Sequence, residues 1–269
     1  MSSIWRIIDS GSQSGPTNMA IDEAILVAVA EGQVPPTIRF YSWKPTCLSI
    51  GRSQSLTDVD LDSVCQYSYD VVRRPTGGRA ILHGDEFTYS VCLSKQDPMV
   101  SQGVLSTYER ISQGLLTGLK ELGVTVDNQS GSDSSELSGP VCFEHRSHYE
   151  ISANGRKLLG SAQMHSRGGV LQHGSLPLRG DLADICKVLF FDSKDVREEA
   201  AVRVRDQAIT LSELIGNEVN WKHIVDAFVQ GFSFALDVQF LFGNLTESEL
   251  KNSEKLLTEK YSNLSWNNN

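Results

Sequence analysis

Arg73-Arg-Pro-Thr-Gly-Gly-Arg-Ala80 joins two runs of residues that favour β-structure, Tyr69–Arg74 and Arg79–His83. Its proline and paired glycines predict a tight turn between two strands, because glycine adopts backbone conformations that other residues avoid. Backbone N–H groups in such a turn can surround an anion, and its three arginines can pair with phosphate or carboxylate oxygens. The spacing is not that of a P-loop. The stretch therefore predicts an anion-binding turn, with a tight hairpin flanked by surface arginines as the alternative.

Other β-prone runs lie on both sides of this turn. Asn154-Gly155 is a strong hairpin signal, because both central residues of the favoured two-residue turn need positive φ. It predicts a hairpin between Tyr149–Ala153 and Arg156–Ala162, with a third strand at Val170–Leu178 near it. The remaining predicted strands are Thr37–Tyr41, Cys47–Ile50, Phe87–Leu93 and Val124–Val126.

Apolar residues at helical spacing predict helices between and after these strands. The first covers residues 19–30 and the second residues 105–122, and each is followed by a glycine that can end it. In the last third of the chain, Asn220 and Thr246 are placed to cap two further helices. No repeat or change of composition divides the chain. The sequence therefore predicts one α/β domain over residues 1–269, with mixed β-sheets, flanking helices and a helical C-terminal part.

Composition excludes several classes of function. The formal net charge of −9 argues against a nucleic-acid partner bound by electrostatics. No apolar run reaches the ~18 residues of a membrane span, and the N-terminus lacks a signal-peptide core. We therefore expect a cytoplasmic protein without a membrane partner. The five cysteines lack CxxC spacing and no cluster of metal ligands is visible, so neither a disulfide framework nor a metal site is predicted.

Lys157 follows the predicted Asn-Gly turn in the run Gly155–Gln163. Side chains alternate along a strand, so Lys157 and Arg156 are expected on opposite faces. If Lys157 faces a cleft, its ammonium can polarise a carbonyl, balance a phosphate or lower the pKa of a nearby thiol. The alternative is a solvated lysine on the strand surface.

Cys142 lies in Gly139-Pro-Val-Cys-Phe-Glu-His-Arg-Ser-His148, after a loop rich in serine and glycine. The side chains of His145, Arg146 and His148 are close to it in sequence. A thiolate is a good acyl acceptor, and cationic neighbours favour it at neutral pH. Cys142 is therefore either a nucleophile or a bystander. The other cysteines lie in apolar or strand contexts that are typical of buried thiols.

Two histidines are further candidates for ligand contacts. His173 lies in Gln172-His-Gly-Ser175 at a strand end, where it can hydrogen-bond a ligand or act as a base. His83 follows the predicted strand that begins at Arg79. Because a single histidine is often a structural hydrogen-bonding group, both residues keep that alternative interpretation.

An ordered set of motifs resembles the lipoate-protein ligase A superfamily, which shares the fold of the biotin-protein ligase catalytic domain. The resemblance covers nearly the whole chain. Its motifs are Asn18–Ala24, Arg39–Pro45, Ser49–Gln54, Arg73–His83, Gly155–Gln163, Leu171–Ser175 and Glu259–Asn267. Within the superfamily, Arg73–His83 and Pro140-Val-Cys-Phe143 look most like the cysteine-dependent octanoyltransferases that use octanoyl-acyl carrier protein.

The resemblance implies a function in lipoate biosynthesis without a cofactor. An octanoyl group would pass from octanoyl-acyl carrier protein to a lysine of a lipoyl-domain acceptor, such as the glycine cleavage H protein. Cys142 would carry the acyl group as a thioester, while Lys157 would contact the acyl carbonyl and favour the thiolate. The other implied substrate contacts are Arg73, Arg74, Thr76, Gly77, Gly78, Arg79, His83, Gly160, Ser161, Ala162 and His173.

Two alternatives remain open from the sequence. In the first, the protein is an ATP-dependent ligase that would adenylate a free acid, either lipoate or octanoate, or biotin in a weaker variant. The acid would bind near Arg73–Arg79 and Lys157. Mg²⁺ would assist, and Cys142 would be dispensable. In the second, a non-catalytic module would bind lipoyl domains or acyl carriers. Arg79 replaces a glycine that is common in the ligases, which favours the transferase. Arg146-Ser-His-Tyr149 departs from the Pro-Ser-Trp-Tyr that usually follows the cysteine.

Overall fold

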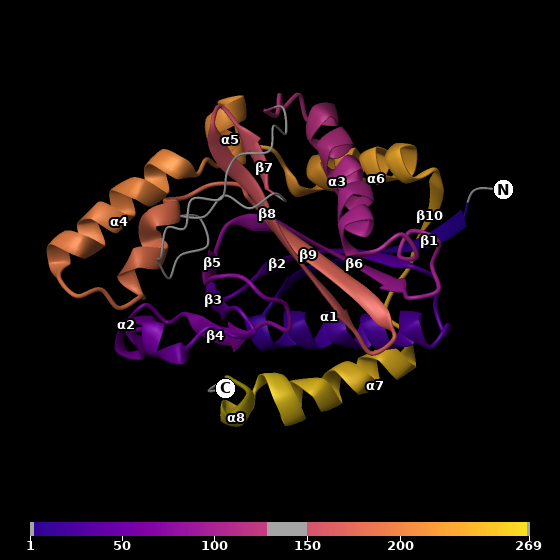
Figure 1. Cartoon of the computed structure of the whole chain (residues 1–269), viewed down its shortest axis with the longest axis horizontal. Coiled ribbons are helices and arrows are strands. Elements are labelled where there is room, and N and C mark those ends of the chain that lie inside the picture. The colour runs from indigo at the N-terminus through magenta and orange to yellow at the C-terminus, as the bar shows by residue number, and fades with distance from the viewer. Residues whose placement is uncertain (1–2, 128–149, 268–269) are drawn as a thin grey trace.

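A seven-stranded β-sheet runs through the middle of the molecule, with helices on both of its faces (Figure 1). The computed structural model describes residues 3–127 and 150–267. The large sheet has the strand order β10-β1-β2-β6-β9-β8-β7, and a second, three-stranded sheet has the order β4-β3-β5. β1 pairs in parallel with β10 and β2, whereas the series from β2 to β7 is antiparallel. These mixed sheets with flanking helices confirm the predicted fold class.

The elements have the following bounds. The strands are β1 Ser3–Gln13, β2 Thr37–Trp43, β3 Cys47–Ile50, β4 Asp70–Arg73, β5 Ile81–His83, β6 Glu86–Ser94, β7 Ile151–Ala153, β8 Arg156–Ser166, β9 Gly169–Pro177 and β10 Val238–Phe242. The α-helices are α1 Gly15–Ala30, α2 Leu61–Gln66, α3 Val104–Glu121, α4 Lys194–Gln207, α5 Leu211–Ile215, α6 Trp221–Leu236, α7 Glu247–Leu256 and α8 Leu264–Asn267. Shorter helical turns are Leu56–Asp58, Leu182–Lys187 and Leu257–Tyr261.

The two faces of the large sheet carry different side chains. Ile38 and Phe40 of β2 join the apolar cluster that α3 and α6 cover. Because side chains alternate along a strand, Arg39 and Tyr41 point to the opposite face, where they meet Asp22 of α1. The core therefore lies mainly under α3 and α6, and the face toward α1 contains a buried polar network.

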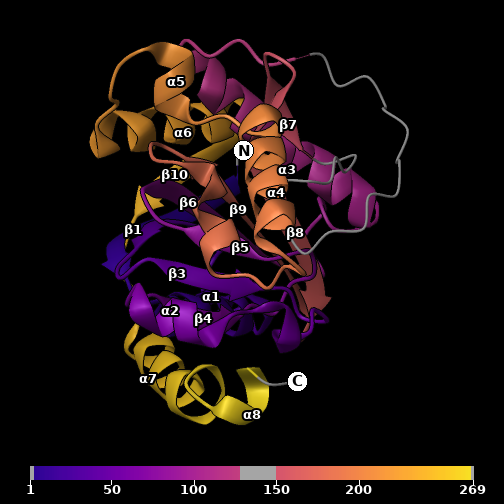
Figure 2. The same ribbon diagram turned by 90° about the vertical axis from the view of Figure 1, so that its left-hand side faces the viewer.

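Helix α1 lies between the large sheet and α7 (Figure 2). It begins earlier than predicted, because the Ser14 side chain accepts a hydrogen bond from the N–H of Thr17 and Pro16 fits the first turn. Most of its residues are buried, so it lacks the polar face of a surface helix. The periodic pattern that would show in the sequence where the helix begins is therefore weak.

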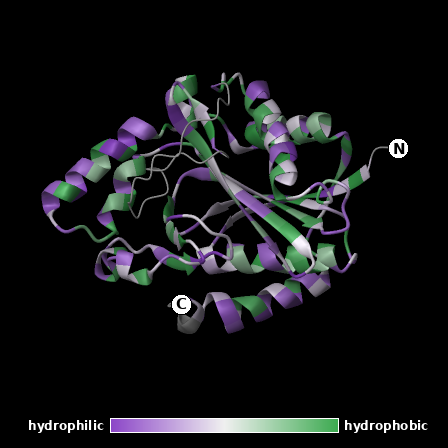
Figure 3. Ribbon diagram, in the orientation of Figure 1, coloured by the Kyte–Doolittle hydropathy of each residue, from purple (hydrophilic) through white to green (hydrophobic). Residues whose placement is uncertain are grey.

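Helix α4 is the opposite case, because most of its residues are hydrophilic (Figure 3). Its buried residues are Ala200 and Val204, and the helix packs on the turn Leu182–Lys187 and contacts β8. Both residues belong to the apolar cluster that also contains Leu48 and Ile50 of β3. In the part of the chain that the structure describes, no helix combines the length and apolarity that a membrane span requires.

The predicted hairpin forms, but one predicted strand does not. Asn154 and Gly155 have φ values of 53° and 73°, and they connect β7 to β8. The prediction of a strand at Val124–Val126 is wrong. The Val124 N–H is used to close α3 by bonding the carbonyl of Leu119, and the following residues have no ladder with a neighbouring strand. β1 and β10, which pair from opposite ends of the chain, were not predicted.

The contact between α3 and α6 depends on close backbone approach at Gly231. A Cβ atom there would lie 2.3 Å from the backbone N of Gly118. Alanine normally stabilises a helix relative to glycine by about 1 kcal/mol, but here it must push two helices apart. We expect Gly231→Ala to lower the free energy of unfolding by about 1–3 kcal/mol in urea titrations. Gln230→Ala, on the exposed side of α6, should not lower it.

Candidate functional site

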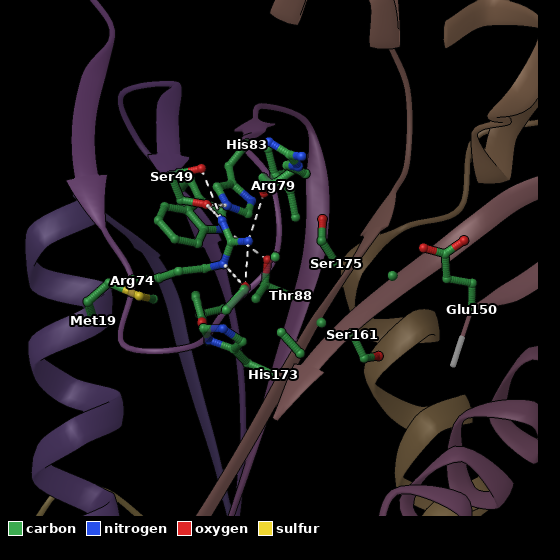
Figure 4. A pocket seen from close by; sticks show the side chains of 18 of the residues that line it. Met19, Ser49, Arg74, Arg79, His83, Thr88, Glu150, Ser161, His173 and Ser175 are labelled. Carbon is green, nitrogen blue, oxygen red and sulfur yellow. Dashed lines mark hydrogen bonds between the residues drawn. The ribbon is translucent and has the colours of Figure 1, made fainter. Parts of the chain in front are cut away.

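A pocket of about 360 Å³ opens between the two sheets (Figure 4). Its walls come from α1, β2, β3, β5, β6, β8 and β9 and from the turn that joins β4 to β5. Small-molecule sites commonly have volumes of roughly 300–1,000 Å³. The predicted site residues that line it are Arg74, Gly77, Gly78, Arg79, His83, Lys157, Gly160, Ser161, Ala162 and His173.

Apolar side chains form a large part of the pocket wall. Met19, Tyr41, Trp43 and Ile81 join the predicted Ala162 there. All four were missed. Met19, Tyr41 and Ile81 lie in a predicted helix or strand, where an apolar residue is normally assigned to the core, and Trp43 lies just after the predicted strand Thr37–Tyr41. Such a wall suits a ligand with a hydrocarbon chain, which would leave water on binding.

Arg74 builds the turn rather than reaching out for a ligand. Its guanidinium donates to the backbone carbonyls of Gly77 at 2.8 Å, Arg79 at 2.7 Å and Ser49 at 3.1 Å. Gly78 has φ of 95°, and a Cβ atom on it would lie 2.8 Å from the Arg74 guanidinium. Arg74 therefore fixes the shape of the turn, and this use of its donors differs from the predicted pairing with a ligand anion.

Arg73 lies outside the pocket, contrary to the expectation that it contacts substrate. Its guanidinium donates to the carbonyls of Gly51 at 2.9 Å, Gln54 at 2.7 Å and Asn267 at 2.9 Å. It thus ties the loop after β3 to the C-terminal helix α8. These partners are distant in sequence, so residue patterns could not reveal them.

Arg79 is the arginine that the structure leaves open to a ligand. It lines the pocket and is exposed to solvent. Within the described residues, its guanidinium has no hydrogen bond or ion pair, whereas those of Arg73 and Arg74 are bound by backbone carbonyls. An anionic part of a ligand at the pocket mouth would therefore meet Arg79 first.

His83 is held rigidly between two neighbours. Its Nδ1 lies 2.7 Å from Glu86 Oε1, and its Nε2 lies 2.7 Å from the hydroxyl of Ser49. The ring also stacks on Trp43, with 3.9 Å between ring centroids. Burial alone would raise the pKa of Glu86, but the interactions with His83, Ser175 and Thr88 together outweigh it and lower that pKa below its ordinary value. His83 is therefore held in place by these partners and forms part of the pocket wall.

His173 connects the pocket to the polar network under α1. Its Nε2 lies 2.7 Å from Thr76 Oγ1, and its Nδ1 lies 3.7 Å from Asp22 Oδ2. Thr76 does not line the pocket itself, so the structure gives it a positioning role. Burial lowers the pKa of His173, and the nearby Asp22 carboxylate opposes this shift without cancelling it. His173 is therefore neutral near pH 7.

This lowered pKa predicts a pH dependence of stability. The unfolded chain takes up a proton near the ordinary histidine pKa of about 6.5, before the folded protein does. Stability should therefore fall as the pH drops below that value, by at most about 1.4 kcal/mol per pH unit, until His173 is protonated in the folded state too. In urea titrations from pH 7.5 to pH 5, we expect His173→Gln to show a flatter profile than the wild type. Parallel profiles would contradict this assignment.

Lys157 and Glu150 form a buried ion pair in the pocket wall. The Nζ of Lys157 lies 2.5 Å from Glu150 Oε1, and the two side chains are only 4% and 9% exposed. Arg156 is less buried, as strand alternation predicted. Gly160 leaves room for the lysine, because a Cβ atom on it would lie 3.0 Å from Lys157 Cε. Glu150 was missed as a site residue, although it lies in the first strand of the predicted hairpin, Tyr149–Ala153.

Ser161 presents a hydroxyl to the pocket. Its Oγ lies 2.7 Å from the hydroxyl of Tyr89, which itself accepts a hydrogen bond from Gln172 at 3.0 Å. Burial raises the pKa of Tyr89 to about 12, so Tyr89 stays protonated and can donate to Ser161. Ser161 can then donate its own hydrogen toward a ligand.

Cys142 lies outside the described residues, as do His145, Arg146 and His148. The other cysteines, Cys47, Cys65, Cys92 and Cys186, form no disulfide and do not line the pocket. Within residues 3–127 and 150–267, no group of three or more histidine, cysteine or acidic side chains is arranged to hold a metal ion.

Comparisons with known proteins relate this geometry to a family. The model of the lipoyl protein ligase A/B catalytic domain matches residues 14–233. The octanoyltransferase LipM of Symbiobacterium thermophilum is 42% identical over 99% of both chains, and that of Moorella thermoacetica is 42% identical over 97% of both. The octanoyltransferase LipM of Bacillus anthracis is 39% identical over 98% of this chain and 97% of its own.

Solved structures share the fold at lower sequence identity. One is the bipartite lipoate protein ligase of Thermoplasma acidophilum, whose structural analysis also included its E2 lipoyl domain. It superposes with a TM-score of 0.82 at 24% identity, covering 98% of this chain and 96% of that one. Lipoate-protein ligase A bound with ATP gives a TM-score of 0.77 at 24% identity, covering 99% and 98%. At this level of identity, the likeness establishes the architecture alone.

Proposed function

Because this chain belongs to the lipoyl protein ligase A/B catalytic-domain family, we propose that it is an octanoyltransferase, an acyltransferase of lipoate biosynthesis. It transfers an octanoyl group to a lysine of a lipoyl carrier protein. The observation that carries this proposal is the pocket, which combines an apolar wall with the buried ammonium of Lys157. The wall suits a medium acyl chain, and the ammonium suits the carbonyl oxygen at its end.

The first half of the proposed reaction loads the enzyme. The Cys142 thiolate attacks the thioester carbonyl of octanoyl-acyl carrier protein, the carbon–sulfur bond of the donor breaks, and the carrier thiol leaves. The exchange of one thioester for another is nearly isoenergetic, so no ATP or metal is required. Negative charge develops on the carbonyl oxygen, where the Lys157 ammonium and the Ser161 hydroxyl are suited to stabilise it.

The second half discharges the acyl group. The acceptor is a lysine on a lipoyl domain, such as that of the glycine cleavage H protein. Its amine attacks the Cys142 thioester, a carbon–nitrogen bond forms, and the Cys142 thiolate leaves. An amide is more stable than a thioester, so this step is downhill. The cytoplasm is the proposed compartment, because Cys47, Cys65, Cys92 and Cys186 are not disulfide-bonded.

The arrangement of the arginines supports transfer over ATP-dependent ligation. A ligase would need cations near the Arg73–Arg79 turn for the phosphates of ATP. Arg73 points away from the pocket, and Arg74 is engaged by backbone carbonyls. Of the three, Arg79 alone has side-chain donors without a protein partner among the described residues.

Intact-mass measurement without ATP tests the proposed function. We expect purified protein mixed with octanoyl-acyl carrier protein to gain one octanoyl group that hydroxylamine removes. Addition of an apo lipoyl domain should discharge this adduct and modify the domain. If the domain is instead modified only with ATP and a free acid, the protein is a ligase. If neither reaction occurs, it is a binding module.

Removing the Lys157 ammonium should slow acyl transfer strongly. We expect Lys157→Met to reduce the rate of octanoyl adduct formation by roughly 10²–10³-fold, because a charge aimed at the developing oxyanion is lost. The buried Glu150 carboxylate also loses its partner, so the free energy of unfolding should fall by about 3–5 kcal/mol. Lys194→Met, which breaks an exposed ion pair with Glu198, should change neither quantity appreciably. Wild-type loading by folded Lys157→Met would contradict the proposed carbonyl contact.

A further inference from the structure

We propose that Glu150 is a catalytic base that takes a proton from the ammonium of the acceptor lysine before the acyl group is discharged. This inference rests on the proposed function and adds a residue to its second half. A lysine side chain is almost fully protonated at neutral pH and cannot attack a carbonyl in that form. Some group near the acyl carbonyl must therefore accept a proton from it.

The two carboxylate oxygens of Glu150 have different surroundings. Oε1 lies 2.5 Å from the Nζ of Lys157. Oε2 is buried and has no hydrogen-bond partner in the described part of the molecule. The side chain is 91% buried, being 9% exposed, and it lines the pocket at the end away from His83 (Figure 4). A buried carboxylate oxygen without a donor is costly, and such groups usually receive a hydrogen bond.

An incoming ammonium satisfies that oxygen. Lys157 and Glu150 together carry no net charge, so the pair alone neither attracts nor repels a cation strongly. A second ammonium at Oε2 would place the carboxylate between two cations. In this arrangement the Lys157 ammonium would act on the acyl carbonyl, and Glu150 Oε2 would act on the nucleophile. The pair thus separates the two tasks of stabilising an oxyanion and receiving a proton.

Other polar residues of the pocket are less suited to accept this proton. His83 has both ring nitrogens within 2.7 Å of side-chain oxygens. His173 is bound to Thr76 through Nε2, and burial lowers its pKa. Arg79 has no acceptor atom in its side chain. Among the described lining residues, Glu150 combines a carboxylate, burial and an oxygen without a donor.

The proton balance of the step is complete. The acceptor ammonium gives one proton to Glu150 Oε2, and the resulting amine attacks the octanoyl thioester. The carbon–nitrogen bond forms and the carbon–sulfur bond breaks. The second proton lost by the nitrogen goes to the departing thiolate. Glu150 returns its proton to water, so the step yields the amide, a thiol and one released proton.

The test compares two nucleophiles on the same acylated enzyme. Wild type and Glu150→Gln are first loaded to completion with octanoyl-acyl carrier protein, or with a small octanoyl thioester, and checked by intact mass. Discharge is then timed with an apo lipoyl domain and with hydroxylamine, which is uncharged at neutral pH and needs no base. We expect Glu150→Gln to slow discharge to the lipoyl domain by roughly 10²–10⁴-fold and discharge to hydroxylamine hardly at all.

A matched control and the pH dependence sharpen the result. Glu198→Gln removes a carboxylate from the exposed Lys194–Glu198 pair and should discharge like the wild type. In Glu150→Gln, the rate with the lipoyl domain should rise with pH as the acceptor lysine loses its proton in solution. Glu150→Asp, which keeps a carboxylate, should recover part of the rate.

Each other outcome overturns the inference. Equal slowing with both nucleophiles, or failure to load, would mean that Glu150 only holds Lys157 in place. Normal discharge to the lipoyl domain would mean that another group takes the proton. Absence of an octanoyl adduct on the wild type itself would instead reject the proposed function, so the two failures are distinguishable.

Discussion

Cys142→Ser is expected to lose the octanoyl adduct completely and to slow acyl transfer on the order of 10⁴-fold or more, as removal of a nucleophile commonly does. A serine hydroxyl is hardly ionised at neutral pH, so it does not replace a thiolate in thioester exchange. The measurement is intact mass after incubation with octanoyl-acyl carrier protein, followed by a timed assay of lipoyl-domain modification. No other cysteine should take over the acyl group.

The structure gives a physical reason for that specificity. Burial is the main factor that raises the pKa of Cys47 and of Cys92 well above the ordinary thiol value, so neither forms a thiolate readily. Cys186 is also buried, in the apolar cluster beneath α4. Cys65 is exposed, but it lies on α2 and does not line the pocket. The described cysteines are therefore poor candidates for the nucleophile.

Cys65→Ser is the matched control for this variant. It exchanges the same atoms at an accessible position, and we expect it to load and discharge like the wild type. An octanoyl adduct that persists on Cys142→Ser but disappears on Cys65→Ser would move the nucleophile to α2. Transfer that survives in Cys142→Ser and requires ATP would make the protein a ligase.

Local signals in the sequence predicted the parts of the fold that depend on neighbouring residues. The Asn154-Gly155 turn formed as expected, because its positive φ values are a property of those two residues. The turn after Arg74 also lies where its glycines placed it. The strand predicted at Val124–Val126 does not form, because the N–H of Val124 bonds the carbonyl of Leu119 in α3. The predicted bounds of α1 were too short, because a helix that is buried on several sides lacks the periodic pattern of apolar and polar residues.

The site was harder to predict where its residues act through distant partners. Sequence patterns grouped Arg73, Arg74 and Arg79 as anion-binding residues, and only the fold separates their contacts. Arg73 bonds a carbonyl 194 residues away in the chain, which no local pattern encodes. Glu150 becomes a functional candidate only because one of its oxygens is buried beside Lys157 without a hydrogen bond. Burial and long-range contacts, rather than residue type, make that distinction.

Asp22→Asn is expected to lower the free energy of unfolding by about 3–5 kcal/mol, because it removes one partner of a fully buried ion pair. The Asp22 and Arg39 side chains have no exposed surface, and their atoms Oδ1 and Nη1 lie 2.8 Å apart. Asp22 also accepts hydrogen bonds from Tyr41 and Ser90, each at 2.8 Å. An amide at this position would turn its N–H₂ group toward one of these donors and leave the Arg39 charge unbalanced.

The exposed pair Lys222–Asp226 provides the comparison in the same protein. Its atoms are as close, at 2.7 Å, but both side chains face solvent, so Asp226→Asn should cost less than about 1 kcal/mol. Urea titrations of both variants at pH 7.5 test whether burial, rather than distance, decides the difference. Equal effects would contradict that explanation.

A double-mutant cycle separates the ion pair from the rest of the network. Arg39→Met should cost about as much as Asp22→Asn, since it leaves a buried carboxylate without its cation. The double variant should lose less than the sum of the two, because no charge is then left unpaired. The remaining loss includes the hydrogen bonds that Asp22 accepts from Tyr41 and Ser90. It also includes those that Arg39 donates to Ser10 and Asn18. Because Tyr41 and His173 line the pocket and both meet Asp22, a folded Asp22→Asn protein should also load octanoyl more slowly than the wild type.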